Sequence, residues 1–231
     1  MSYGFSARSF PSLGGQFYGE LGKSWYLWQK KPSPVLFGLV RPSIKFESIG
    51  VINTVGAKLE FFPISFVAFY AGHSDSWIKT RLKAFNCDTL VQCKGRLERS
   101  YIGVKLALKY KKNFLLGGGE IQRLSFAPKN KLFPDYEYVL EGHPKGDQLQ
   151  TWWAIFGHQW KDYKIGVGQV IAGMKRQKGV YNQTFAFGSK VFSEKYILSL
   201  GAGTAKSLKH KKQGLFLLKL DIIHWPSLKL F

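Results

Sequence analysis

Three residues that together resemble a hydrolytic triad in type, His73, Ser74 and Asp75, are adjacent in this 231-residue chain. A serine hydroxyl becomes a nucleophile when a histidine accepts its proton and an acidic group orients that histidine. The three residues follow a strand expected over residues 66–72, and neighbours on a strand point to opposite faces. His73 and Ser74 would therefore meet only at a bend, and we predict that this triplet is not a catalytic set.

Cys87 and Cys93 are the two cysteines of the chain, and both fall in a long polar break over residues 73–96. In an oxidising compartment a disulfide between them is favoured, and two free thiols are the alternative. Two cysteines alone do not make a metal site. We expect neither a metal nor a cofactor.

The elements that position these residues are β-strands. From residue 163 to 223 large apolar residues recur with period two through four segments separated by short polar breaks. The other face of each segment carries Gly, Ala, Ser or Lys. The large residues predicted to share one face are Tyr163, Ile165, Val167 and Ile171; Tyr181, Phe185, Phe187 and Val191; Tyr196, Leu198, Leu200 and Ala202; and Phe216, Leu218, Leu220 and Ile222.

In a soluble β-sandwich the large residues would face the core and the outward face would be rich in polar side chains. A face of small residues instead fits the crowded inside of a narrow barrel, with the large apolar face toward lipid. This alternation predicts an all-β fold, a transmembrane antiparallel up-and-down β-barrel. The 7 Trp, 11 Tyr and 19 Phe of the chain fit aromatic girdles at two membrane interfaces.

The chain ends in Leu228, Lys229, Leu230 and Phe231, and here it resembles the bacterial outer-membrane β-barrel proteins, whose last strand typically ends in an aromatic residue. The resemblance covers residues 35–231. It implies the outer membrane of a Gram-negative bacterium and contact with the outer-membrane assembly machinery during biogenesis. No signal peptide follows Met1, so we expect a mature sequence.

Break lengths alternate between short and long, which predicts about ten strands with both termini in the periplasm. Twelve strands result if residues 16–30 or 130–148 add a hairpin. Residues 1–34 are expected to form an N-terminal extension at the periplasmic interface, and a hairpin with residues 35–47 is the competing interpretation. The barrel domain is expected over residues 35–231.

A net charge of +20 would ordinarily suggest nucleic acid as the partner. The basic residues, however, fall in breaks or singly on the small-residue face, without the motifs of a nucleic-acid-binding fold, so we expect no nucleic acid. We expect membrane lipid, lipopolysaccharide or phospholipid, to contact the basic residues of the breaks; the alternative is that they only keep the loops solvated. These residues are Lys30, Lys31, Lys175, Arg176, Lys178, Lys206, Lys209, Lys211 and Lys212.

Charged residues on the small-residue face are predicted to share the lumen, and basic residues outnumber acidic ones among them. They are Arg41, Lys45, Glu47, Lys58, Glu60, Lys105, Lys109, Lys164, Lys190, Lys219 and Asp221. A barrel of about ten strands should be largely filled by its side chains. The set then forms either a structural network of ion pairs or a narrow pore that prefers anions.

Three functions follow as expectations. The first is a non-enzymatic barrel with an occluded lumen that organises its membrane by homo-oligomerisation and lipid binding; a monomer is the alternative to the oligomer. The second is a narrow anion-preferring channel. The third is an enzyme that modifies lipid A or phospholipid, because some outer-membrane barrels use His and Ser on the outer wall. The aromatic residues expected at an oligomer or lipid interface are Trp25, Tyr26, Trp28, Trp152 and Trp153.

Overall fold

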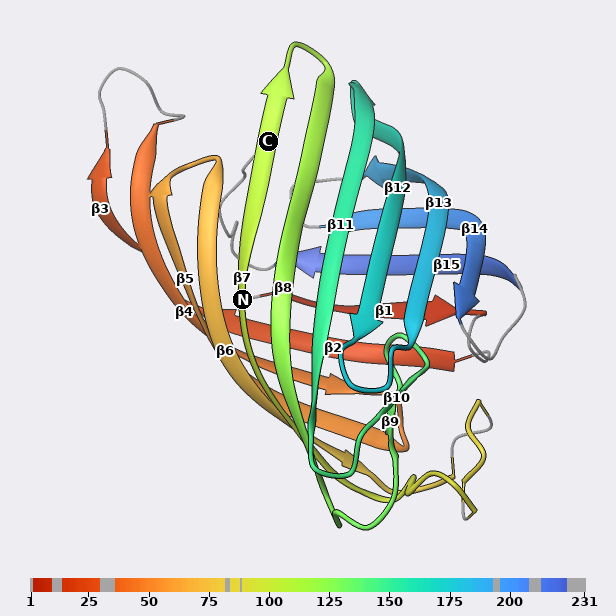
Figure 1. The fold of residues 1–231 in the computed structure, drawn as a ribbon. Helices are drawn as coiled ribbons and strands as arrows, with labels where there is room; N and C mark the ends of the chain where they lie inside the picture. The colour runs from red at the N-terminus through yellow and green to blue at the C-terminus, as the bar shows by residue number, and fades with distance from the viewer. Residues whose placement is uncertain are drawn as a thin grey trace.

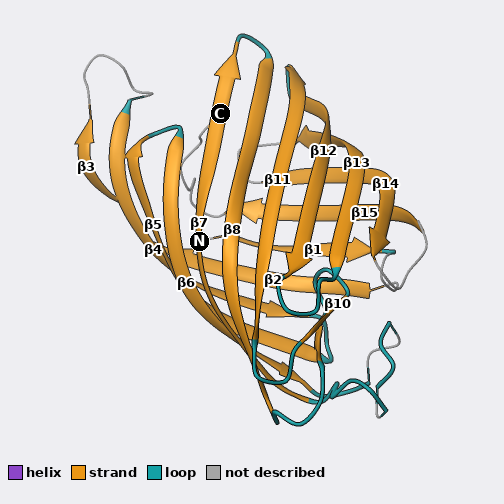
Figure 2. Ribbon diagram, in the orientation of Figure 1, coloured by secondary structure: helices purple, strands orange, loops and turns teal. Residues whose placement is uncertain are grey.

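The structure is a computed structural model that describes residues 2–9, 14–29, 36–81, 84–87, 89–192, 196–207 and 213–223. These residues build one antiparallel sheet of thirteen strands and a separate two-stranded sheet. Figure 2 shows strands joined by loops and turns. Within the described ranges, no helix is long and apolar enough to cross a membrane.

The sheet closes into a barrel because β2 pairs with β4. Twelve strands form the ring (Figure 1), which confirms the predicted transmembrane-type barrel. They are β1 (Ser2–Arg8), β2 (Gly14–Gly22), β4 (Phe37–Ser48), β5 (Ile52–Ile64), β6 (Val67–Ile78), β7 (Gly95–Tyr110), β8 (Asn113–Ala127), β11 (Asp147–Trp160), β12 (Tyr163–Met174), β13 (Val180–Val191), β14 (Tyr196–Ser207) and β15 (Gln213–Ile223). The thirteenth strand, β3 (Trp25–Gln29), pairs with the start of β4 outside the ring. The small sheet joins β9 (Phe133–Asp135) and β10 (Leu140–Gly142).

The predicted count of ten strands is wrong, and the alternative of twelve is right. The two additional strands are β1 and β2, so residues 2–8 and 14–22 lie in the barrel wall rather than in an extension. Of the two segments predicted to add a hairpin, 16–30 contributes residues 16–22 to β2, whereas the β9–β10 hairpin within 130–148 forms a separate sheet. Glycines hide the strand pattern of β2: Gly19, for example, pairs with Tyr3 on one side and Phe46 on the other, whose side chains line the wall beside it.

Two long connections mark one end of the barrel, although residues 49–51, between β4 and β5, make a short turn at that same end. At the short-turn end, residues 65–66, 111–112 and 161–162 join neighbouring strands. At the opposite end, which we call the long-loop end, residues 79–94 join β6 to β7 and residues 128–146 join β8 to β11. Ser2 pairs with Ile223, so β1 begins and β15 ends at the short-turn end. That both chain termini lie in the periplasm remains a prediction.

The large apolar residues of β12, β14 and β15 face outward, as predicted, but those of β13 face the inside of the barrel. Exposed Tyr163 pairs with Lys190, and exposed Val167 pairs with Ala186, so these residues of β13 face outward. Phe185 and Phe187 face inward, opposite Gly168 and Gly166. A side-chain carbon added at either glycine would collide with the opposing ring, so the two rings occupy the space that the glycines leave.

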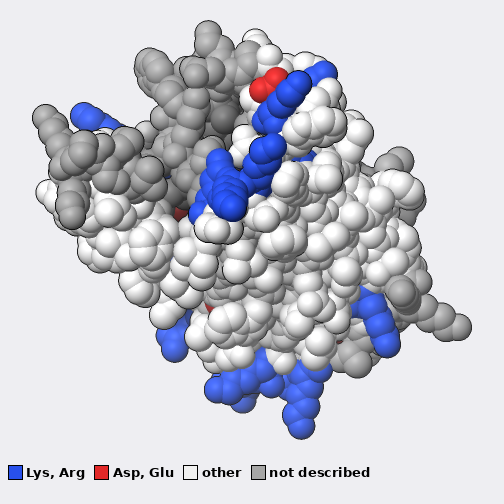
Figure 3. Space-filling view, turned by 90° about the horizontal axis from the view of Figure 1, so that it is seen from above, with Lys and Arg blue, Asp and Glu red and all other residues white. Residues whose placement is uncertain are grey.

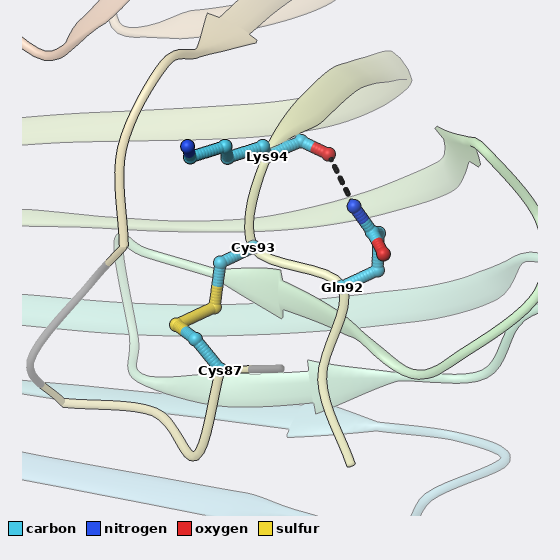
Figure 4. Close-up of a disulfide and its surroundings, with 4 residues drawn as sticks. All are labelled: Cys87, Gln92, Cys93 and Lys94. Atoms are coloured by element: carbon cyan, nitrogen blue, oxygen red, sulfur yellow. Dashed lines mark hydrogen bonds between the residues drawn. A yellow bond between two sulfur atoms is a disulfide. The ribbon is translucent and has the colours of Figure 1, made fainter. Parts of the chain in front are cut away.

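The predicted disulfide between Cys87 and Cys93 is confirmed (Figure 4). It lies in the 79–94 connection at the long-loop end, and its Cα atoms are 5.5 Å apart. Beside it, the Gln92 side-chain amide donates to the backbone carbonyl of Lys94 at 2.9 Å. The Gln92 backbone N–H donates to the carbonyl of Leu132, so this connection is tied to the neighbouring 128–146 connection.

The main buried cluster lies at the long-loop end. Inward residues from every barrel strand between β5 and β15 contribute to it, together with Phe133, Val139 and Leu140 from the 128–146 connection. The rings of Phe126 and Phe133 stack with centroids 5.6 Å apart. The members from the barrel strands are Ile52, Ile78, Leu97, Leu124, Phe126, Leu149, Ala172, Met174, Tyr181, Ala205 and Leu215. The connection therefore folds back against the inner wall of the barrel.

Candidate functional site

Inside the barrel, Glu60 is the centre of an ion-pair network. Its carboxylate lies 3.1 Å from Lys105 Nζ, 3.2 Å from Lys58 Nζ and 3.5 Å from Arg41 Nη1. Arg41 also pairs with Glu20 at 2.8 Å. Elsewhere on the inner wall Lys45 pairs with Glu47, Lys219 pairs with Asp221, and Lys109 donates to the side-chain carbonyl of Gln159 at 3.0 Å.

The network changes the charge balance expected for the lumen. Glu20 and Glu120, absent from the predicted set, face inward and line a lumenal cavity of about 390 Å³ with Lys45, Lys58 and Lys105. Lys164 faces inward as predicted, since it alternates with exposed Tyr163 and Ile165. Lys190 does not: it faces outward, with its Nζ 5.2 Å from the ring centre of Tyr163. The excess of basic over acidic groups is therefore much smaller than the sequence suggested.

A buried ion pair joins the inner wall to the 128–146 connection. Arg99 on β7 lies 2.6 Å from Asp135 and 2.8 Å from Glu137. Burial raises the pKa of the Asp135 carboxyl above its usual range, against the opposing influence of Arg99. The Tyr136 hydroxyl lies within hydrogen-bond distance of Thr54 and Ser76 on the inner wall, at 3.1 and 3.0 Å.

A groove on the outer wall is the second candidate site. Its volume is about 1170 Å³, and it runs over β6, β7 and β8 up to the long-loop end. Ala71, Ile102 and Ile121 line its apolar part. Its other part is lined by basic residues, Arg123, Lys145, Lys175 and Arg176.

The basic end of this groove is held together by a buried carboxylate. Asp147 accepts hydrogen bonds from the backbone N–H groups of His143, Gln148 and Arg176, at 3.2, 2.8 and 2.9 Å. The Arg176 guanidinium in turn donates to the carbonyl of Gly146 at 3.0 Å. The loops that carry Lys145 and Arg176 are thus fixed to each other, which makes the groove a built feature of the fold.

A serine that lines this groove meets a histidine of the neighbouring strand. His73 pairs directly with Ser100 across β6 and β7, and its Nδ1 lies 2.9 Å from Ser100 Oγ. The other ring nitrogen, Nε2, lies 3.8 Å from Asp75 Oδ2. Ser74 is on the face opposite to His73, as predicted, and the structure shows that it lines the lumenal cavity. Sequence reasoning missed Ser100 because it comes from the neighbouring strand, 27 residues further along the chain.

The predicted lipid contacts lie in different places. Lys175 and Arg176 line the groove, Lys178 is exposed in the β12–β13 turn, and Lys206 is exposed on β14. Lys30, Lys31, Lys209, Lys211 and Lys212 lie outside the described residues, as does the chain end at Phe231. Seen from above, the surface is mostly uncharged, and its Lys and Arg side chains gather in a few groups (Figure 3).

The predicted interface aromatics divide between the two faces. Trp25, Tyr26 and Trp28 on β3 are exposed, and so is Trp152 on β11. Trp153 faces inward instead, beside Gly118, because adjacent residues on a strand point to opposite faces. Trp153 is therefore not available to an interface on the outer wall.

No family model matches the sequence, and no curated protein matches it either. Solved structures do match in fold. A KdgM porin is 8% identical, with 97% of this chain and 100% of that chain covered and a TM-score of 0.51. A NanC porin is 9% identical, with 96% and 98% covered and a TM-score of 0.52. An outer membrane channel from Pseudomonas putida F1 is 10% identical, with 96% and 92% covered and a TM-score of 0.51. With its closed twelve-strand ring, this chain has the fold of the bacterial outer-membrane β-barrel proteins.

Proposed function

We propose that this protein resides in the outer membrane of a Gram-negative bacterium and binds an anionic lipid in the groove of its outer wall. The observation that carries the proposal is the division of that groove into an apolar part and a basic part. A lipid has the same division, since its acyl chains are apolar and its phosphate groups are anionic. Ile102 of the apolar part is exposed, as is Phe69 on β6, and both belong to the wall expected to face lipid.

The basic residues of the groove supply the affinity for the anionic phosphate groups of a lipid. Near an anionic membrane surface each Lys or Arg contributes about 1 kcal/mol, and Arg and Lys form charge-assisted hydrogen bonds with phosphate oxygens. Four basic residues line one end of the groove, and the Asp147 carboxylate that faces them is already engaged by three backbone N–H groups. The basic end is thus left to attract an external anion.

Lipid binding is tested with Lys145→Ser and Lys175→Ser, which remove two cations from the groove. Native mass spectrometry after exposure to phosphatidylglycerol should show less bound lipid than in the parent protein, whereas binding of phosphatidylcholine should not change. Lys178→Ser and Lys206→Ser are matched controls, because these exposed lysines do not line the groove. Equal retention of phosphatidylglycerol by all four variants would refute the proposal.

A channel is the alternative that the fold of the porins favours. Two observations weigh against it: the apolar cluster that the 128–146 connection forms with the barrel strands, and the near balance of lumenal charge. We infer that this cluster closes the lumen at the long-loop end. Planar-bilayer recordings should then show no steady conductance, and a stable anion-selective conductance in the parent protein would favour the channel.

Homo-oligomerisation is supported by β3. This strand pairs with β4 along one edge, and all five of its residues are exposed. An exposed edge strand can pair with the same strand of a second copy. Tyr26→Pro would remove a donor from this strand, and native mass spectrometry in mild detergent should show monomers for this variant and dimers for the parent. A parent protein that is itself monomeric would exclude this assembly.

A further inference from the structure

His73, Ser100 and Arg123 form one rung across three strands of the outer wall. Ser100 pairs with His73 of β6 on one side and with Arg123 of β8 on the other. Paired residues share a face of the sheet, so all three side chains point outward. Ser100 and Arg123 also line the groove described above.

The rung lies where the outer wall changes from apolar to polar. On β6 the outward residues change from Phe69 and Ala71 to His73 and Asp75, and on β8 from Ile121 to Arg123. On β7 Ile102 lies on one side of Ser100 and Glu98 on the other. Such a change marks the boundary between hydrocarbon and headgroups. The acyl esters of a membrane lipid lie at this boundary.

The imidazole of His73 lies between a hydroxyl and a carboxylate. With Nδ1 2.9 Å from Ser100 Oγ, it can accept the hydroxyl proton, and Nε2 then carries its proton toward Asp75. The 3.8 Å gap to Asp75 is longer than a hydrogen bond, as is common before substrate binds. Arg96 Nε holds the other oxygen of Asp75, Oδ1, at 2.9 Å, which leaves Oδ2 directed at His73.

We propose that Ser100 is the nucleophile and His73 the general base of an esterase site that cleaves an acyl ester of the anionic lipid bound in the groove. The proposal rests on the lipid binding proposed above and adds a reaction to it. Asp75 is the residue that positions His73. Arg123, next to Ser100 on the rung, is placed to donate to the oxygen that becomes negative in the transition state.

The reaction proceeds in two balanced steps. Ser100 Oγ attacks the ester carbonyl carbon while His73 takes the hydroxyl proton; the bond to the lipid alkoxide breaks, and His73 gives the proton to that oxygen. The products are an acyl-serine and a lipid alcohol. Water then attacks the acyl-serine with His73 again taking a proton, and the return of that proton to Ser100 Oγ releases the fatty acid. The net reaction consumes one ester and one water and yields one alcohol and one carboxylic acid.

The first experiment measures fatty acid release by the refolded full-length protein. It uses mixed micelles of phosphatidylglycerol in one arm and of lipopolysaccharide in the other, so that release in either arm identifies the lipid source. Ser100→Ala and His73→Asn should each lower the rate at least about 100-fold. Ser74→Ala is the matched control, because this serine neighbours His73 but faces the lumen, and its rate should equal that of the parent. Absence of release by the parent in both arms overturns the proposal.

A second measurement identifies the nucleophile directly. A fluorophosphonate probe should label the parent protein at Ser100, and His73→Asn should abolish the labelling although Ser100 is retained. Labelling at another serine, or labelling that does not depend on His73, overturns the proposal.

The two proposals fail in distinguishable ways. If Ser100→Ala still binds phosphatidylglycerol by native mass spectrometry and the parent releases no fatty acid, lipid binding stands and hydrolysis does not. If neither the parent nor any variant binds lipid, but the parent cleaves a soluble short-chain ester and needs Ser100 to do so, the catalytic residues stand and the lipid-binding groove does not.

Discussion

Replacing Arg99 by methionine should release the 128–146 connection from the inner wall. Methionine keeps much of the side-chain volume but leaves Asp135, which has no exposed side-chain surface, as an unpaired buried charge. Removing one partner of a buried ion pair costs about 3–5 kcal/mol. The pairing with Glu137, whose side chain is 47% exposed, is screened by solvent and contributes about 1 kcal/mol or less.

The cost should depend on pH in a defined direction. Burial already holds the pKa of Asp135 above its usual range, and removal of Arg99 raises this pKa further. A carboxyl whose pKa is higher in the folded state favours that state at low pH, and the advantage is lost as pH rises through the folded-state value. In Arg99→Met the connection should therefore be held best under acidic conditions and open as pH rises toward neutrality.

Hydrogen exchange of residues 133–142 measures this opening. A loss of about 3–5 kcal/mol corresponds to exchange that is roughly 150-fold to 5,000-fold faster, provided exchange follows the opening equilibrium. Glu137→Gln is the matched control and should change exchange by less than about tenfold. The double variant Arg99→Met with Asp135→Leu should regain most of the protection, because it removes both charges. Unchanged protection in Arg99→Met at neutral pH would refute the reasoning.

Three further predictions concern the wall and the loops. Alkylation of the unfolded, non-reduced protein should modify neither Cys87 nor Cys93. Cys93→Ala should destabilise the 79–94 connection by about 2 kcal/mol in thermal or urea unfolding, because closing so short a loop removes about that much entropy from the unfolded chain. Leu200→Arg, on the exposed lipid-facing side of β14, should cost about 2–4 kcal/mol in a vesicle folding titration, whereas Tyr196→Arg at the strand end should cost about 1 kcal/mol or less. Gly166→Ala should cost about 1–3 kcal/mol in the same titration, because its new methyl group meets the Phe187 ring. Gly188→Ala should be neutral, because the space around Gly188 is open. A larger cost for Gly188→Ala than for Gly166→Ala would contradict the assignment of faces in β13.

Period-two alternation was sufficient to predict ten of the twelve barrel strands. It missed β1, which has only seven residues, and β2, where a lipid-facing strand needs no large side chain because its neighbours cover the wall. Gly19 lies between Tyr3 and Phe46, so the wall is continuous although the strand itself lacks an apolar residue there. The sequence of one strand does not show which apolar side chains the neighbouring strands add to the wall beside it.

The reversed faces of β13 have a related cause. Its sequence places large residues at alternate positions, which favours a lipid-facing assignment. Inside a barrel, however, large residues are accepted wherever the opposing strand leaves room, and Gly166 and Gly168 leave room for Phe187 and Phe185. Because a shift of one residue exchanges the two faces, the pairing register rather than hydrophobicity decides which face is which.

Register also decides whether the outer wall has a reactive rung. His73 and Ser100 meet because β6 and β7 pair in one alignment, and Arg123 joins them because β7 and β8 pair in one alignment. The second alignment is fixed by a two-residue turn at residues 111–112, and the first by a connection that carries the disulfide and is bonded to the 128–146 connection. A slip of one residue between β6 and β7 would set His73 against Arg99 or Tyr101, and the Ser100 hydroxyl would no longer face its ring. The loops at the long-loop end therefore have a role beyond filling the barrel, since they hold His73 and Ser100 in the one register that puts both on the lipid boundary.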